Sequence, residues 1–439
     1  MGARDRLRVV ASQGRSFVSE VARNGADVLN VLGGDLAKKR MPLAHEDAYL
    51  GNRIPTLFDR LREHAPRIHN LAVQSATVRD AASVGNPGVL LKLGRPAWAG
   101  LVAQRGQRET TTLVPVSHSV RLDWPMAPGD TKLLETYEEA KRKQWNASTS
   151  LDWDGKRTFN WQTAVDPMNP DFFVIPERLI PPASSRFWSR LSSSQKEAQT
   201  RAYATWILSQ ILHGEQGALV ISGQLVETMP GRDAKLMAAT QVMDEARHVE
   251  VFERYLREKL EGYYPPNDNL YTVLIANIAQ GDWDLKSLPM NIMIEGLAMS
   301  IFGVLRTNTK EPLLAGLLQL VVVDEARHVK FGAHLLEQHY REASSAVIRD
   351  REDFAFELAL LLHNRFLAHE IYEEFYAPLM TRAEWDDLVS NSTLTKEFRW
   401  RLFRGIMPNL DKIGLLSSRI RKHYEKHGLL RFETESAEP

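Results

Sequence analysis

A motif that carries both a carboxylate and an imidazole occurs twice in the chain. Asp-Glu-Ala-Arg-His runs from Asp244 to His248 and again from Asp324 to His328. Each copy is preceded at the same distance, about 30 residues, by a further glutamate, which is Glu215 or Glu295. Glutamate and histidine three residues apart share one face of a helix. The repeat therefore predicts two equivalent groups, each with two carboxylates and one imidazole.

These two groups predict a pair of metal ions. Four carboxylates in an apolar environment cannot stay buried and charged without compensating cations. A set rich in carboxylates, poor in nitrogen and free of sulfur favours iron or manganese over structural zinc or copper. Helical bundles hold two iron or manganese ions with this ligand set. We predict two iron ions, or a manganese–iron pair, bound by Glu215, Glu245, His248, Glu295, Glu325 and His328.

The charged neighbours of the ligands have a predicted role as well. A metal-bound histidine usually donates its second ring N–H to a carboxylate. We expect Asp244 to orient His328 and Asp324 to orient His248, across the pseudo-twofold axis of the repeat. Arg247 and Arg327 would then pair with these aspartates.

The alternative interpretation is that such residues lie on solvated helix faces. A single Glu-x-x-His usually does, and clusters of Asp, Glu and Arg usually form surface ion pairs. The duplication in matched register and the aliphatic residues that precede each motif argue against that here. A third group, His363, His369 and Glu370, has no matching copy and is interpreted as structural.

Helix hairpins must bring the residues together. About 30 residues of unbroken helix would span roughly 45 Å, so no ion could contact both ends. Pro230-Gly231 lies near the middle of the first segment, and Asn308 to Pro312 near the middle of the second. Because these residues break helices and favour turns, each repeat is predicted to be a helix hairpin.

The wider pattern predicts an all-α fold. Its core is a four-helix bundle of two hairpins, with extra helices and an irregular N-terminal extension. The apolar period predicts helices over 136–145, 201–228, 234–260, 291–305, 313–340 and 354–376. Residues 16–32 and 55–73 are amphipathic, and 111–116 look β-like. We expect three parts of one assembly: an extension (1–195), the bundle (196–345) and C-terminal helices that complete it (346–439).

Composition excludes several functions. Lysine plus arginine equals aspartate plus glutamate at 55 each among 439 residues, which gives no electrostatic reason to expect nucleic acid as a partner. The chain has no cysteine, hence no thiolate nucleophile or iron–sulfur cluster. No uninterrupted apolar run reaches the roughly 18 residues that span a bilayer. A cytoplasmic, homo-oligomeric protein is expected.

At these residues the sequence resembles the ferritin-like di-iron carboxylate superfamily. The doubled Asp-Glu-x-Arg-His is most similar to the catalytic α subunits of bacterial multicomponent monooxygenases, over roughly residues 215–334. A loop from Gln144-Trp145 to Trp153 adds to the likeness. The resemblance implies that Glu215, Glu245 and His248 bind one iron, that Glu295, Glu325 and His328 bind the other, and that the reduced pair activates O2.

Three positions depart from related families. Met299 stands where those hydroxylases carry a threonine, and Phe252 stands where ribonucleotide reductase small subunits carry a radical tyrosine. Val321 replaces an additional histidine of the di-iron arylamine N-oxygenases, which weakens the case for N-oxygenation. Phe252 and Met299 are instead candidates for an apolar substrate-pocket wall.

The function expected is an oxidoreductase: an O2-dependent di-iron monooxygenase acting on a small apolar or aromatic molecule. An external reductase or ferredoxin would supply the electrons, because the chain shows no other redox centre. The alternatives are a di-iron N-oxygenase or an acyl desaturase-like oxidase, and a ferroxidase of the iron-storage type. The length of the N-terminal extension argues against iron storage.

Overall fold

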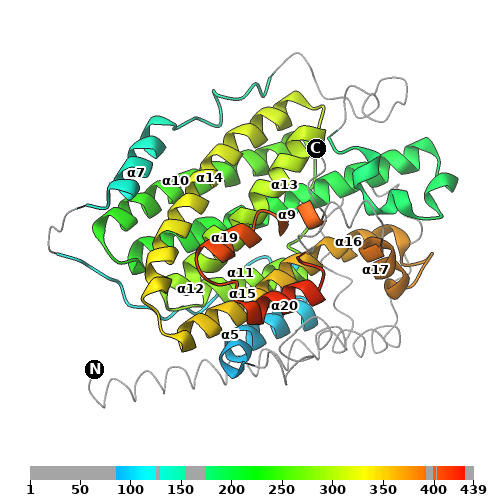
Figure 1. Ribbon diagram of the computed structural model, residues 1–439. Helices are drawn as coiled ribbons and strands as arrows, with labels where there is room; N and C mark the ends of the chain where they lie inside the picture. Colours follow the sequence, from blue (N-terminus) through cyan, green and yellow to red (C-terminus); the bar gives the residue numbers. More distant parts are fainter. Residues whose placement is uncertain (1–85, 125–128, 155–173, 392–398, 402, 431–439) are drawn as a thin grey trace, which may run out of the picture.

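The computed structural model describes residues 86–124, 129–154, 174–391, 399–401 and 403–430. Within these ranges the chain is helical and contains no strand, which confirms the prediction of an all-α fold. Long helices run side by side through the centre, and shorter helices cover them (Figure 1). The amphipathic stretches 16–32 and 55–73 lie outside the described residues.

The first hairpin joins α9 (Ser193–Thr228) to α10 (Arg232–Tyr255). Ser192 caps α9 with a capping box, in which its hydroxyl accepts from the Gln195 backbone N–H and the Gln195 side chain accepts in return. The turn falls at the predicted place, and Gly231 there has a φ of 80°, which glycine adopts without strain. The hairpin prediction is confirmed.

The second hairpin joins α13 (Glu295–Asn308) to α14 (Pro312–Arg341). Glu311 caps α14 by accepting from the backbone N–H groups of Leu313 and Leu314, and Pro312 occupies the first helical position. The two hairpins pack together through α10 and α14, so each contributes two helices to the four-helix core.

Shorter helices enclose this core. On one side α7 (Thr131–Arg142) packs across α10 and α14. On the other, α11 (Asp268–Ile278) contacts α9 and α15 (Ser345–Asn364), and α5 (Pro87–Ala97) and α20 (Ser418–Lys426) pack against α15. The helices after residue 345 thus contribute to the same core, while the proposed three-part division of the chain stays a prediction.

Two expectations about single elements were wrong. The predicted helix over 354–376 begins earlier, at Ser345, and ends at Asn364, followed by short helical turns. The break is at Ala368, whose φ of 49° is incompatible with a right-handed helix. The β-like residues 111–116 belong to neither a helix nor a strand. An apolar pattern alone does not supply a neighbouring strand with which to pair.

One helical stretch among the described residues, Trp283–Asn308, is long and apolar enough to cross a bilayer. It contains Glu295, and 72% of its most apolar window is buried inside the bundle. The packing of this stretch accounts for its apolar character, because a helix surrounded by other helices is apolar on all sides.

Candidate metal centre

The bundle brings all six predicted ligand residues to one place in its interior. Glu215 comes from α9, Glu245 and His248 from α10, Glu295 from α13, and Glu325 and His328 from α14, and none is more than 5% exposed. Two groups of ligand atoms, each within 4.8 Å of one another, share Glu245 and Glu325. The two groups are therefore adjacent and have two carboxylates in common.

The imidazole Nδ1 atoms face the carboxylates. Nδ1 of His248 lies 3.3 Å from oxygens of Glu215 and Glu245 and 3.1 Å from Glu325. Nδ1 of His328 lies 3.2 Å from Glu245, 3.3 Å from Glu325 and 3.7 Å from Glu295. Each Nδ1 therefore faces a set of carboxylate oxygens, as a ligand to a common ion would.

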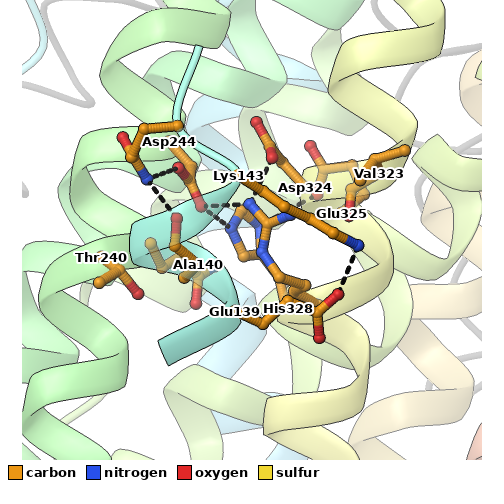
Figure 2. Close-up of polar contacts among 12 residues, drawn as sticks. Glu139, Ala140, Lys143, Thr240, Asp244, Val323, Asp324, Glu325 and His328 are labelled. Carbon is orange, nitrogen blue, oxygen red and sulfur yellow. Dashed lines mark hydrogen bonds and ion pairs between the residues drawn. The ribbon is translucent and has the colours of Figure 1, made fainter. Parts of the chain in front are cut away.

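The other imidazole nitrogens contact aspartates from the opposite hairpin. Nε2 of His328 lies 3.1 Å from Asp244, and Nε2 of His248 lies 3.3 Å from Asp324. Figure 2 shows Asp244 and His328 facing each other beside α7. An aspartate that accepts from Nε2–H leaves the Nδ1 lone pair free for a metal. These are the crossed contacts expected from the repeat.

Arginines and the end of α7 cover the aspartates. Arg247 and Arg327 each form ion pairs with both Asp244 and Asp324, and all four side chains are buried. From the loop after α7, the Trp145 indole donates to Asp324 at 2.7 Å. On the side next to α7, these buried ion pairs therefore separate the centre from solvent.

In the metal-free centre, burial and neighbouring charges shift the pKa values of several predicted ligands. Burial raises the pKa of Glu215 well above its usual range, and the nearby Glu325 carboxylate raises it further. Burial also raises the pKa of Glu295. Although burial alone would lower the histidine pKa values, hydrogen bonds to Asp324 and Asp244 hold those of His248 and His328 well above their usual range. Without metal ions, these glutamates and histidines therefore retain protons, and bound cations would replace those protons.

The donor set fits two metal ions on three counts. Ligand atoms about 2 Å from a shared ion lie no more than about 4 Å apart, and the ligand atoms of each group already lie within 4.8 Å of one another without an ion. Oε2 of Glu245 is fully buried and accepts no hydrogen bond. Two divalent cations would balance four glutamates, which burial otherwise disfavours.

Sequence reasoning missed a polar network that holds Glu295. The Gln241 amide donates to Glu295 and, at 3.2 Å, to Glu245. The Asn291 amide donates to the Gln241 carbonyl at 3.0 Å and to Glu295 at 3.2 Å, and Ser287 donates to Asn291 at 2.8 Å. Gln241 precedes its motif glutamate by one helical turn, which is the only signal that could have pointed to it.

A π-helical segment, η8 (Leu288–Ile294), places the network. Its last hydrogen bond runs from the Glu295 backbone N–H to the Met290 carbonyl. Pro289 near its start has no N–H to donate, which favours a widened turn. Such turns often occur at functional sites. Here the widened turn ends at a predicted ligand.

A small cavity lies against the glutamates. Its wall is mainly apolar, but Arg365 also lines it, and no sequence pattern had indicated that residue. The lining residues are Gln210, Ile211, Gly214, Glu215, Ala218, Met290, Ile294, Glu295, Leu297, Ala298, Ile301, Phe302, Glu325 and Arg365.

The two predicted pocket residues do not line this cavity. Phe252 is fully buried behind it and stacks on Phe302, with ring centroids 5.8 Å apart. The face of α13 that lines the cavity includes Leu297, Ala298 and Ile301. Met299 lies on a different face of the helix, so it does not line the cavity and is only partly buried.

The third group of histidine and glutamate residues is dispersed among other partners. His363 contacts Arg399, and His369 contacts Asp386 at 2.6 Å. Glu370 accepts from Asn267 and Trp206. Among the described residues, this group does not form a cluster that could hold a metal ion.

Comparison with known proteins gives one family match. Residues 132–414, more than half of the chain, match the family described as P-aminobenzoate N-oxygenase AurF. No curated protein matches the chain. Two variants of an R2-like ligand-binding oxidase with reconstituted Mn/Fe cofactors are 16% and 17% identical, covering 65% of this chain and 94% of theirs. Their TM-scores against this chain are 0.37 and 0.38.

Proposed function

The chain belongs to the AurF family of di-iron N-oxygenases, and from this premise we propose which residues hold the metals and what the centre does. The protein is an oxidoreductase with a di-metal centre that uses O2. We assign the metal ligands to the two overlapping groups, with Glu245 and Glu325 shared between the ions. The reaction proposed is monooxygenation of a small, largely apolar or aromatic substrate.

The observation that carries this assignment is the burial of four carboxylates and two imidazoles, which form two overlapping groups whose ligand atoms lie within 4.8 Å of one another. Two iron ions bound there supply the reduction and activation of O2. The chain's own residues do the rest. Asp244 and Asp324 hold the Nε2 protons, so that Nδ1 of each imidazole stays unprotonated, and the apolar cavity wall excludes water.

The electrons must come from outside the chain. Insertion of one oxygen atom of O2 into a substrate, with the second released as water, consumes two electrons and two protons. The sequence contains no cysteine and no other evident redox centre. We therefore propose an external reductase or ferredoxin as donor. Homo-oligomerisation and a cytoplasmic location stay predictions.

Metal analysis tests the assignment. We expect two irons per chain, coupled antiferromagnetically when oxidised, as measured by Mössbauer spectroscopy on isotopically enriched protein. Glu245→Ala and Glu325→Ala each remove a shared ligand and should abolish the coupled signal. Glu258→Ala, at a surface ion pair with Arg254, is the control. Full stoichiometry in both ligand variants would show the assignment to be wrong.

N-oxygenation is the second candidate, and the family match favours it. Val321 stands where arylamine N-oxygenases carry an additional histidine, yet the match holds without that residue. Turnover under isotopically labelled O2 separates the candidates. Label on carbon supports hydroxylation, label on nitrogen supports N-oxygenation, and oxidation without label supports a desaturase-like reaction.

A further inference from the structure

The two halves of the centre differ in what surrounds Glu215 and Glu295. Their aspartates and arginines are duplicated and make matching contacts. The amides that hold Glu295 are not duplicated. Gln241 lies one helical turn before the glutamate of the first motif, and Val321 occupies the same place before the second motif. The repeat is therefore broken at the residues that contact one ligand.

The amide network leaves the Glu295 carboxylate one orientation. Gln241 donates to its Oε1 atom and Asn291 to its Oε2 atom. Ser287 donates to the side-chain carbonyl of Asn291, and the Asn291 amide donates to the side-chain carbonyl of Gln241. Neither amide can therefore turn around without losing hydrogen bonds. All three side chains are fully buried, so water does not compete for Glu295.

Glu215 has no such support among the described residues. Ile211, which is apolar, occupies the place that corresponds to Asn291. The contact of the Glu215 carboxylate is with Nδ1 of His248 at 3.3 Å, and that atom is assigned to the metal. The nearby amide of Gln210 is engaged by the loop before α11. The Glu215 carboxylate is thus free to change its orientation.

A fixed orientation favours metal binding at Glu295. Amide N–H groups stabilise the ionised carboxylate, which is the form that binds a metal ion. Each carboxylate oxygen has two acceptor positions, so an oxygen that accepts one hydrogen bond keeps a second position for an ion. A side chain that is already held in place also loses less freedom when the ion binds.

We infer that the two metal positions are inequivalent and fill in a fixed order. The position of Glu295 and His328 binds the first ion tightly, and the position of Glu215 and His248 binds the second ion more weakly. Gln241 is, with its amide partner, the positioning residue that sets this order. The inference rests on the metal ligands assigned in the proposed function. Because the proposed reaction uses both ions, the weaker position sets the metal concentration at which the enzyme becomes active.

Titration of the metal-free protein with manganese(II) tests the order without turnover. Calorimetry measures the affinities, and electron paramagnetic resonance distinguishes an isolated ion from a coupled pair. The first equivalent should give the spectrum of an isolated ion and the second that of a coupled pair, with affinities at least about 10-fold apart. Because two cations repel each other, identical positions would also fill in two steps, so ligand variants must assign the steps.

Glu215→Ala and Glu295→Ala make that assignment. Glu215→Ala should keep the tight first step and lose the second. Glu295→Ala should lose the tight step and bind one ion at least about 10-fold more weakly. Equal first-step affinities in the two variants, or tighter binding by Glu295→Ala, would overturn the inequivalence alone. A failure of the unaltered protein to bind manganese(II) would overturn the ligand assignment as well.

The combined variant Gln241→Val and Asn291→Ile tests the network, because it introduces the residue types that the other half of the repeat carries. The first step should weaken by about 10- to 100-fold, and the second should stay nearly unchanged. Gln199→Val is the matched control. Gln199 is also buried, at 1% exposed, but accepts from Tyr376 elsewhere on α9, so both steps should be unaffected. A loss shared equally by both steps in the combined variant would overturn the positioning role.

Discussion

At the scale of single residues, the centre is a balance between negative ligands and the groups that orient them. Asp244 and Asp324 each contact a histidine of the opposite hairpin and both arginines. An aspartate that receives two guanidinium contacts stays ionised, and an ionised aspartate keeps the proton of its histidine on Nε2. The aspartates thus act on the metals through the imidazoles.

Asp324→Asn tests this positioning role. An asparagine keeps the shape but weakens the acceptor for His248, so metal affinity should fall by about 10- to 100-fold. Competition with a chelator measures the affinity, and Asp244→Asn should behave in the same way because it occupies the equivalent place in the repeat. Asp350→Asn, which disrupts a pair with Lys92, is the control. Unchanged metal affinity in Asp324→Asn would contradict the role.

At the scale of elements, the close packing of α14 against η8 positions the amides of Gln241 and Asn291 that contact Glu295. Gly332 of α14 lies against Asn291, and a Cβ atom at Gly332 would be only 2.3 Å from the Asn291 Cβ. The two helices can come this close only because residue 332 has no side chain. The same approach aims Asn291 at Gln241 and Glu295.

Gly332→Ala should therefore separate the two elements. We expect a loss of about 1–3 kcal/mol in the free energy of unfolding, as for other overpacked interiors, together with reduced metal occupancy. Urea denaturation and metal analysis measure both. Gly303→Ala in α13 is the control, because a Cβ there meets no atom within 4 Å, and it should stabilise the helix by up to about 1 kcal/mol. Equal stability of the two variants would refute the packing argument.

At the scale of the whole molecule, the four long helices share one charged interior, so metal binding and folding are linked. Metals that bind only the folded bundle stabilise it by mass action. Chelation should lower the melting temperature, and anaerobic addition of iron(II) should restore it. Calorimetry of loaded and metal-free protein measures the difference. Glu245→Ala should show no response to either treatment.

The difference in melting temperature between loaded and metal-free protein should change with pH in a defined direction. In the metal-free protein, hydrogen bonds to carboxylates outweigh burial and raise the pKa of His248 and His328. A raised histidine pKa stabilises the fold below the unfolded value of about 6.5, and this contribution is lost as pH rises through the folded pKa. The raised pKa values of Glu215 and Glu295 act in the same direction.

Metal binding instead requires the deprotonated ligands. The gap in melting temperature between loaded and metal-free protein should therefore widen from about pH 6 to about pH 8. A gap that narrows over this range would show that the two histidines are not among the groups that metal binding deprotonates.

The sequence by itself determined the helical class, both hairpins and the six residues that meet in the core. The reason is that this information is local or repeated. The Glu-x-x-His spacing places both side chains on one helix face, Pro230-Gly231 predicts a turn, and the duplication predicts that the arrangement occurs twice. It also indicated the di-iron oxygenase class, and the family match agrees with that class.

Only the tertiary structure decided how the centre is supported and what lies beside it. Gln241, Asn291 and Arg365 belong to three different helical segments, and no spacing along the chain relates them. Their importance arises from contacts made when α10, η8 and the end of α15 pack around one interior. The same packing excluded Met299 from the cavity wall, because the phase of a helix against its neighbours decides which face is enclosed.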